Sequence, residues 1–384
     1  MRNLKRLKLL SLILLGLITC SCQNQDDYVT GVQEPISEVD TLKLIDFKGL
    51  PVNHRFKTPV EELETVHTEG TLKTMYNKAR FTRAKKKGLA FKTVEVELPN
   101  PETIIEASSK VLEQFPYENS DNGDETSNTV DMDMITSDFP TLSKEEVVKN
   151  IEVIDEYYSQ NLDYVVLNEV AENEEMYQNT LSKSTTAQKS ASDWGLLWCT
   201  LTTFQNPWNI VVPVLTGFTY RTGEFSYIRS IISMFYSNKY AKQYSAEEYG
   251  NTSDNKGDAY KHILWNSFLA HYYWTVSSKA PRLRFAEAIT YAYEDCSPND
   301  ADAREMDYHN NYIGRKLWDD NCGYRKWWWM TVGLRKPSIS TLKTKAKALV
   351  EAGKFIDNRL GTMPSRAKEI KDNTSKYQVV YLKK

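Results

Sequence analysis

The sequence predicts a mainly α-helical protein, with a C-terminal multi-helix domain preceded by a mixed helix and strand N-terminal region and a disordered acidic linker. Apolar residues recur at helical spacing through most of residues 194–384. Hydrophobic residues make up 41% of the 384-residue chain and aromatic residues 12%, which is enough for a sizeable core. Residues 117–140 are rich in acidic and polar side chains, as disordered linkers are.

Changes in composition along the chain give the boundaries of these regions. The predicted segments are a lipoprotein signal peptide at 1–22, an N-terminal region with short strands and helices at 23–116, the acidic linker at 117–140, a helical segment at 141–181, a small polar connector at 182–193 and the C-terminal helical domain at 194–384.

The first 22 residues have the layout of an export signal: a basic start, a short apolar run and small residues with cysteine. The run is too short to span a membrane comfortably. A cysteine at such a junction is typical of bacterial lipoproteins, in which the thiol carries fatty acyl chains such as palmitate. Cys22 follows the small Ser21, and Cys20 has the apolar Leu17 three places before it. We therefore expect lipidation at Cys22 or Cys20; the alternative is a cleaved, secreted protein.

Two stretches in the N-terminal half have clear local signals. Val94, Val96 and Leu98 alternate with polar residues like a strand, and a helix is expected to begin at Pro101. Ser143 followed three residues later by Glu146 forms a capping box, which predicts one helix or two across residues 141–181.

The C-terminal domain is predicted as one helix after another. The expected helices are Gly223–Ser245, Asp258–Ser277, Ala280–Asp295, Asp307–Trp318 and Ser338–Asp357. Pro281 and Ser338 are residues that favour a helix start. Residues 376–384 are expected to add one short strand.

The helix after Gly257 carries polar residues in an otherwise apolar run. Asp258, His262 and Asn266 are four residues apart, so they form one slanting stripe on the helix. A carboxylate one turn before an imidazole can fix its tautomer and raise its basicity. The alternative is that Asp258 only caps the helix and His262 is a satisfied core histidine.

A second polar motif, REMDYHNNYIGRKLW, follows at residues 304–318. Its predicted shared face contains Asp307, Asn310, Asn311 and Gly314, with Arg315 beside it. His309 points away from that face. Gly314 allows a neighbouring helix or a ligand to come close. Two adjacent asparagines in such a place indicate a polar interior or a ligand surface, because a buried amide is costly unless it is hydrogen-bonded.

Glu294 lies between the two motifs, at the end of an apolar helix stripe. Glu294 with Asp258, His262 and Asp307 would supply the mixed nitrogen and oxygen ligands that a divalent metal accepts, and His262, Glu294 and Asp307 are the candidate ligands. The spacing matches no standard metal motif. A metal-free acid/base site with His262 and one carboxylate is the alternative.

The motifs DAYKHILWN and REMDYHNNYIGR, with Glu294 between them, resemble an uncharacterised bacterial family, domain of unknown function 6973. The resemblance covers the C-terminal side of the chain and implies a mostly helical fold with no established activity. Lys261 stands where the family more often has arginine. The site residues that the resemblance implies are Asp258, His262, Asn266, Glu294, Asp307, Asn310, Asn311 and Arg315.

These observations lead to a functional hypothesis of a lipoprotein of the bacterial cell envelope, anchored to the outer membrane and facing the periplasm or the cell surface. Its helical domain is expected to hold a polar pocket of a hydrolase. Catalysis is assigned to His262, Asp258, Glu294 and Asp307, and binding of an oxygen-rich small molecule or glycan to Asn266, Asn310, Asn311 and Arg315. The alternative is a non-enzymatic surface module in which the same residues form a packing network.

Two further expectations concern partners and cysteines. The net charge is only −3 and no basic surface interleaves with aromatic residues, which argues against nucleic-acid binding. An exported chain can form disulfides, and Cys296 with Cys322 brackets the second motif. The alternative for these two residues is a pair of unconnected buried thiols.

Overall fold

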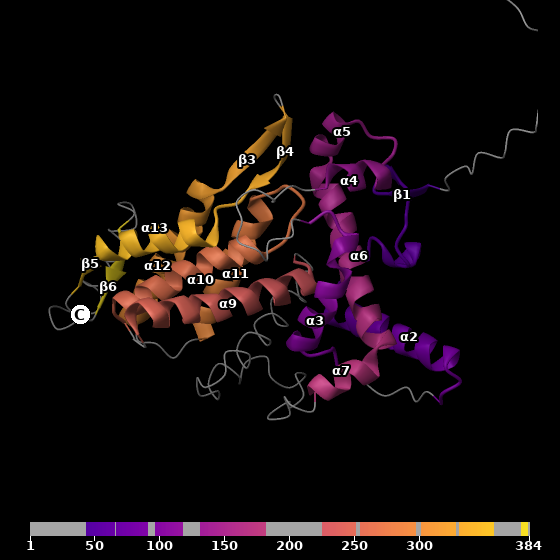
Figure 1. Ribbon diagram of the computed structural model, residues 1–384, viewed down its shortest axis with the longest axis horizontal. Helices are drawn as coiled ribbons and strands as arrows, with labels where there is room; N and C mark the ends of the chain where they lie inside the picture. Colours follow the sequence, from indigo (N-terminus) through magenta and orange to yellow (C-terminus); the bar gives the residue numbers. More distant parts are fainter. Residues whose placement is uncertain are drawn as a thin grey trace, which may run out of the picture. The chain divides into compact units, whose positions relative to one another are not determined.

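Helices make up most of the structure, and short strands connect or flank them (Figure 1). The computed structural model describes residues 44–65, 67–90, 97–117, 131–181, 225–250, 254–296, 301–327, 330–356 and 378–382. Leu44–Lys384 form one compact unit. The signal segment with Cys20 and Cys22, the connector at 182–193, the first part of the linker and most of the predicted strand at Val94–Leu98 lie outside the described residues.

The N-terminal part begins with a β-hairpin that the sequence had not localised. Strands β1 (Ile45–Phe47) and β2 (Leu50–Val52) pair antiparallel. Both turn residues between them have positive φ, 51° at Lys48 and 84° at Gly49, as a tight hairpin turn requires. The helices that follow are η1 (Val60–Glu62), α2 (Glu69–Lys86), α3 (Pro101–Val111) and η2 (Leu112–Gln114). The predicted helix start at Pro101 is confirmed.

The structure differs from the linker prediction over residues 131–140. Helix α4 (Met132–Asp138) forms there, and the Asp131 side chain accepts a hydrogen bond from the backbone N–H of Met134. Ile135 and Phe139 are fully buried. The acidic composition concealed this helix, because its apolar residues are few, although Ile135 and Phe139 fall one turn apart and both reach the core.

The predicted capping box is confirmed and begins helix α5 (Lys144–Lys149). The Ser143 hydroxyl accepts from the Glu146 N–H, and the Glu146 carboxylate accepts from the Ser143 N–H at 2.8 Å. Helix α5 is followed by α6 (Ile151–Glu172) and α7 (Glu174–Leu181). Helix α6 packs against both α2 and α3 and is the centre of the N-terminal helices.

The C-terminal helices surround one central helix (Figure 1). They are α9 (Tyr227–Tyr249), α10 (Lys256–Tyr272), α11 (Ala280–Cys296), α12 (Ala301–Asn321) and α13 (Ile339–Glu351). Helix α10 contacts all four others. Every residue of α10 is buried except Lys256 and Lys261. The polar stripe of this helix therefore lies inside the protein.

Helix ends differ from the predicted ones by several residues. Helix α12 begins at Ala301, before the predicted start at Asp307, and α10 ends at Tyr272, before the predicted end at Ser277. Ser338 caps α13 as expected, with its side chain accepting from the Thr341 N–H. None of the helices in the described ranges is long and apolar enough to cross a membrane.

Four short strands complete the C-terminal part. Strands β3 (Gly323–Trp327) and β4 (Met330–Arg335) form an antiparallel hairpin, and β5 (Lys354–Phe355) pairs in parallel with β6 (Val380–Tyr381). The expected terminal strand is confirmed as β6. The β3–β4 hairpin was not predicted, because three consecutive tryptophans remove the alternation by which a strand is recognised. Cys322 is buried before β3, whereas the Cys296 side chain lies outside the described part, so the disulfide stays a prediction.

Candidate functional site

Three helices bring seven of the predicted residues together in the interior. They are Asp258, His262 and Asn266 from α10, Glu294 from α11, and Asp307, Asn311 and Arg315 from α12. Each is at most 8% exposed. Segments that are far apart in the sequence therefore form one polar centre.

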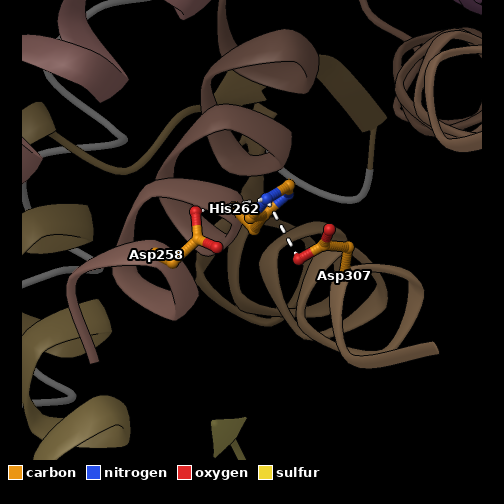
Figure 2. Close-up of side chains that lie close together, drawn as sticks. All are labelled: Asp258, His262 and Asp307. Atoms are coloured by element: carbon orange, nitrogen blue, oxygen red, sulfur yellow. Dashed lines mark ion pairs between the residues drawn. The ribbon is translucent and has the colours of Figure 1, made fainter. Parts of the chain in front are cut away.

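Two carboxylates approach the same nitrogen of the His262 imidazole. Nε2 lies 3.1 Å from Oδ1 of Asp307 and 3.6 Å from Oδ1 of Asp258. Figure 2 shows the side chains of Asp258, from the same helix, and Asp307, from α12, directed toward the ring. One potential ligand atom from each of these three residues lies within 4.8 Å of the other two. The backbone N–H of Asp254 donates to the second oxygen of Asp258 at 2.8 Å and fixes its orientation.

The other imidazole nitrogen faces an amide and a third carboxylate. Nδ1 lies 3.1 Å from Oδ1 of Asn311 and 3.6 Å from Oε1 of Glu294. The Asn311 side chain also donates to Oε1 of Glu294 at 3.0 Å. The other carboxylate oxygen of Glu294, Oε2, is buried and has no hydrogen-bond partner within the described residues.

Asn266 and Arg315 continue this network away from the imidazole. The Asn266 amide donates to Oδ1 of Asn311 at 2.5 Å and accepts from the Arg315 guanidinium at 3.1 Å. Arg315 donates further to Thr290 at 3.1 Å and to Glu287 at 3.4 Å. Thr290 is one helix turn before Glu294 on α11. It belongs to the network although the sequence analysis missed it, and that spacing was the available signal.

Lys261 is the cation next to the carboxylates. Its ammonium donates to Oδ1 of Asp258. Burial works against the charge of Lys261, but the Asp258 carboxylate outweighs it and raises the Lys261 pKa. The sequence marks Lys261 only as a departure from the family motif and does not predict its contact with Asp258.

Burial and neighbouring charges shift the pKa values of the imidazole and the carboxylates in this cluster in different directions. Burial, with a contribution from the Lys261 charge, lowers the pKa of His262 to about 4, so the imidazole is neutral at pH 7. Burial raises the pKa of Glu294 to about 7 and that of Asp307 well above its usual value. Burial acts in the same direction on Asp258, but the neighbouring His262 and Lys261 outweigh it and lower the Asp258 pKa.

Gly314 brings the two helices that carry most of the site into close contact. A Cβ atom at Gly314 would collide with the backbone carbonyl of Ile263 and the Cβ of Asn266. The Ser267 hydroxyl donates to the carbonyl oxygen of Gly314 at 2.8 Å. The expectation that Gly314 admits a neighbouring helix is confirmed, and this close approach places Asp307 within reach of His262.

The structure does not bring Asn310 into the site. Its amide nitrogen donates to the carbonyl oxygen of Val380 at 2.9 Å, and its oxygen accepts from the Val380 N–H at 3.3 Å. His309 contacts the Gln378 carbonyl at 2.5 Å through Nε2 and faces away from His262, as expected. Asn310 was predicted to bind substrate, and in the structure its amide holds the β6 strand against α12.

Three of the clustered residues could hold a metal. One nitrogen of His262 and one oxygen each of Asp258 and Asp307 lie within 4.8 Å of one another, and divalent metals accept such a donor set. Glu294, which was also predicted as a ligand, lies beside Nδ1, whereas Asp307 lies beside Nε2.

Comparison with known protein families covers the segment that contains this site. Residues 225–332 match the model of a family described as a domain of unknown function, DUF6973. The site lies within this matched segment. The resemblance predicted from the two motifs is thereby confirmed, and the segment includes all seven clustered residues, whereas α13 and β6 follow it. Neither the curated proteins nor the solved structures give a match to this chain.

Proposed function

We propose that this chain is a lipid-anchored protein of the bacterial cell envelope whose DUF6973 domain is a hydrolase acting at the His262 centre. The observation that carries the proposal is a neutral imidazole held among carboxylates whose pKa values are shifted in opposite directions. Active sites commonly contain titratable groups separated in this way, because one group must accept a proton while another donates one.

Each residue has a role in this proposal. As a general base, His262 takes a proton from the attacking water. As a metal ligand, it would instead hold an ion that would lower the pKa of that water. Asp258 stays ionised, and Asp307 with its raised pKa is the group that holds a proton for the leaving group. Asn311 orients the imidazole through Nδ1. The substrate is an oxygen-rich small molecule or glycan, and Lys261, the partly exposed residue beside Asp258, marks the side from which it approaches.

An activity screen with matched variants tests the hydrolase proposal. The purified chain is assayed against ester, phosphoester and glycoside substrates beside His262→Gln, Asp307→Asn and the control Asp320→Asn. Asp320 is on the same helix as Asp307 but is exposed and pairs with Lys316. We expect one substrate class to be hydrolysed by the wild type and the control and at least 100-fold more slowly by the two site variants. Equal rates in all four proteins would remove the proposal.

Burial of the network favours a second candidate, a non-enzymatic surface module in which these residues specify helix packing. Asn266, Glu294 and Asn311 are at most 1% exposed and hydrogen-bond across three helices. A pure packing role predicts that replacing His262 and Asp307 together by leucine keeps or raises the melting temperature, because apolar residues often substitute well for buried charges. A large loss of stability would count against this candidate.

The membrane anchor is a separate part of the proposal. Cys22 or Cys20 carries the acyl chains in it, and the lipid membrane is the partner. Cys20→Ser and Cys22→Ser variants are compared by membrane fractionation. One of the two should move the protein to the soluble fraction, and soluble wild-type protein would overturn the anchor.

A further inference from the structure

We propose that Asp258, His262 and Asp307 bind one divalent transition metal, Zn²⁺ or Mn²⁺, through Nε2 of the imidazole and one oxygen of each carboxylate. The proposal goes beyond the hydrolase function, since a metal can bind here whether or not the domain catalyses a reaction. Metal–ligand bonds of about 2.0–2.2 Å place two tetrahedral ligands about 3.4 Å apart. The Nε2–oxygen distances of 3.1 Å and 3.6 Å bracket that spacing.

Arg315, at the end of the network away from the imidazole, fixes the direction of the hydrogen bonds. A guanidinium has only donors, so the Asn266 oxygen must be the atom that faces Arg315. The Asn266 nitrogen then faces Asn311 and donates to its oxygen. An Asn266 amide turned the other way would put its N–H₂ group against the guanidinium, with donors on both sides.

The same logic settles the tautomer of His262. The Asn311 oxygen receives the Asn266 donor, and the Asn311 nitrogen donates to Glu294. Only an acceptor is therefore presented to Nδ1 of His262, so Nδ1 carries the ring proton. In a neutral imidazole the lone pair is then on Nε2, the nitrogen next to Asp258 and Asp307. Metal-binding histidines have this arrangement, with an oxygen acceptor on the other ring nitrogen.

A lone pair and two carboxylates facing one another need a positive group between them. Three acceptors within 4.8 Å in a buried site repel unless a proton or a cation is shared. A divalent metal satisfies all three atoms at once. The unpartnered buried oxygen of Glu294, on the other side of the ring, adds negative charge that a nearby cation would also offset.

The contact with Lys261 is compatible with a bound metal. The Lys261 ammonium contacts Oδ1 of Asp258. Each carboxylate oxygen has a second lone pair, so this contact leaves Asp258 able to bind a metal.

Calorimetric titration of the chelator-treated full-length chain in detergent tests the binding. ZnCl₂ and MnCl₂ are titrated into the wild type, Asp258→Asn, Asp307→Asn and the exposed control Asp320→Asn, with circular dichroism to show that each is folded. We expect one equivalent to bind to the wild type and the control, and at least tenfold weaker binding to both site variants. Absence of binding to the folded wild type, or equal binding to all four proteins, would overturn the proposal.

Two further measurements keep the proposal testable if a site variant does not fold. X-ray absorption of the Zn²⁺-loaded wild type should show one imidazole and oxygen ligands; a sulfur ligand would place the metal at a cysteine and refute the site. Long-range ¹H–¹⁵N spectra of the metal-free protein, with His262 assigned by comparison with His262→Gln, should show the Nδ1–H tautomer. An Nε2–H tautomer would contradict the proposed ligand atom.

Arg315 is a positioning residue, because it fixes the orientation of the Asn266 amide. A substitution that can also accept a hydrogen bond should therefore change the His262 tautomer and the metal affinity, which a residue that only packs would not affect. Arg315→Lys keeps a donor-only group and should retain the Nδ1–H tautomer and the metal affinity. Arg315→Gln can also accept, so the Asn266 amide can turn, and we expect mixed tautomers and about tenfold weaker Zn²⁺ binding. Identical tautomers and affinities in both variants would remove Arg315 from the account. Hydrolysis by chelator-treated protein would support the proposed hydrolase but refute a catalytic metal. Metal binding without hydrolysis would support the metal site but count against the proposed hydrolase.

Discussion

Two buried charged clusters in this protein differ in how their charges are balanced. The first joins α9 to α6: Arg229 donates to the carboxylate of Asp155 at 2.8 Å and also to the Tyr117 hydroxyl, and the Val276 N–H donates to Asp155 at 2.7 Å. One cation meets one anion there. The second is the His262 centre, where three carboxylates surround a neutral imidazole and Lys261 is the cation in direct contact.

The difference separates a structural cluster from a candidate site. A balanced pair of charges with good geometry holds two helices together and requires nothing more. A cluster with excess negative charge costs folding free energy unless a proton or a metal ion joins it. Selection for stability alone would not favour the second arrangement, which supports a ligand or a reaction at the His262 centre.

The largest expected effect concerns the balanced pair. Arg229→Met leaves the buried Asp155 carboxylate without its partner, so the free energy of unfolding should fall by about 3–5 kcal/mol. Urea denaturation followed by circular dichroism measures this. The double variant Arg229→Met/Asp155→Leu should recover much of the loss, and an equally unstable double variant would show that the charges were not the cause.

The next effect concerns the unbalanced cluster and its dependence on pH. Glu294 has a folded-state pKa of about 7 against a usual value of 4.5, so the folded protein binds its proton more tightly than the unfolded chain does. Its contribution to stability is complete below pH 4.5 and is lost as the pH rises through 7. We expect the wild type to lose up to about 3 kcal/mol relative to Glu294→Gln between pH 4.5 and pH 8.

The comparison with Glu294→Gln is needed because His262 acts in the opposite sense. Its folded-state pKa of about 4 lies below the usual value of 6.5, so its contribution to stability is complete above pH 6.5 and is lost as the pH falls toward 4. Both proteins keep His262, so their difference isolates Glu294. The measurement is urea denaturation in metal-free buffer; parallel pH profiles for the two proteins would contradict the raised pKa of Glu294.

A smaller effect is expected for Asn310, which is next to the site residue Asn311 but holds β6. Asn310→Ala removes both hydrogen bonds to Val380 and should cost about 1–3 kcal/mol, because the buried backbone groups lose their partner. The affinity for Zn²⁺ should not change by more than twofold. Thermal denaturation and calorimetric titration measure the two quantities. A large loss of affinity at unchanged stability would return Asn310 to the site.

The smallest effect concerns the cation that already contacts Asp258. Lys261→Met removes a positive charge that repels a second cation, so Zn²⁺ should bind a few-fold more tightly. Lys261→Arg keeps the charge and is the matched control. Weaker binding to Lys261→Met than to the control would mean that Lys261 supports the bound ion in place of competing with it.

Sequence periodicity predicted the helices and part of the cluster. Asp258, His262 and Asn266 follow a four-residue period on α10, and Asp307 with Asn311 was predicted to share a face of α12; a stripe of this kind on a buried helix must face another polar group. Glu294 was predicted from its place at the end of an apolar stripe on α11. The family resemblance implied the set as a whole, Arg315 included.

The sequence alone could not show which neighbouring element each helix face packs against. Asn310 and Asn311 are adjacent, so they point about 100° apart on α12, and only the position of β6 shows that Asn310 belongs to the strand. The choice between Asp258 and Glu294 as a metal ligand likewise depends on which side of the imidazole each one reaches. Helix α4 and the β3–β4 hairpin were missed because their apolar residues are few or lie in one uninterrupted run.

The central claim is the proposal that the His262 centre binds a divalent cation, and titration of Zn²⁺ into chelator-treated wild type and Asp307→Asn tests it most directly. The account predicts one equivalent bound by the wild type, with at least tenfold weaker binding to Asp307→Asn and no change in Asp320→Asn. Binding that is absent from the folded wild type, or the same in Asp307→Asn, would contradict it.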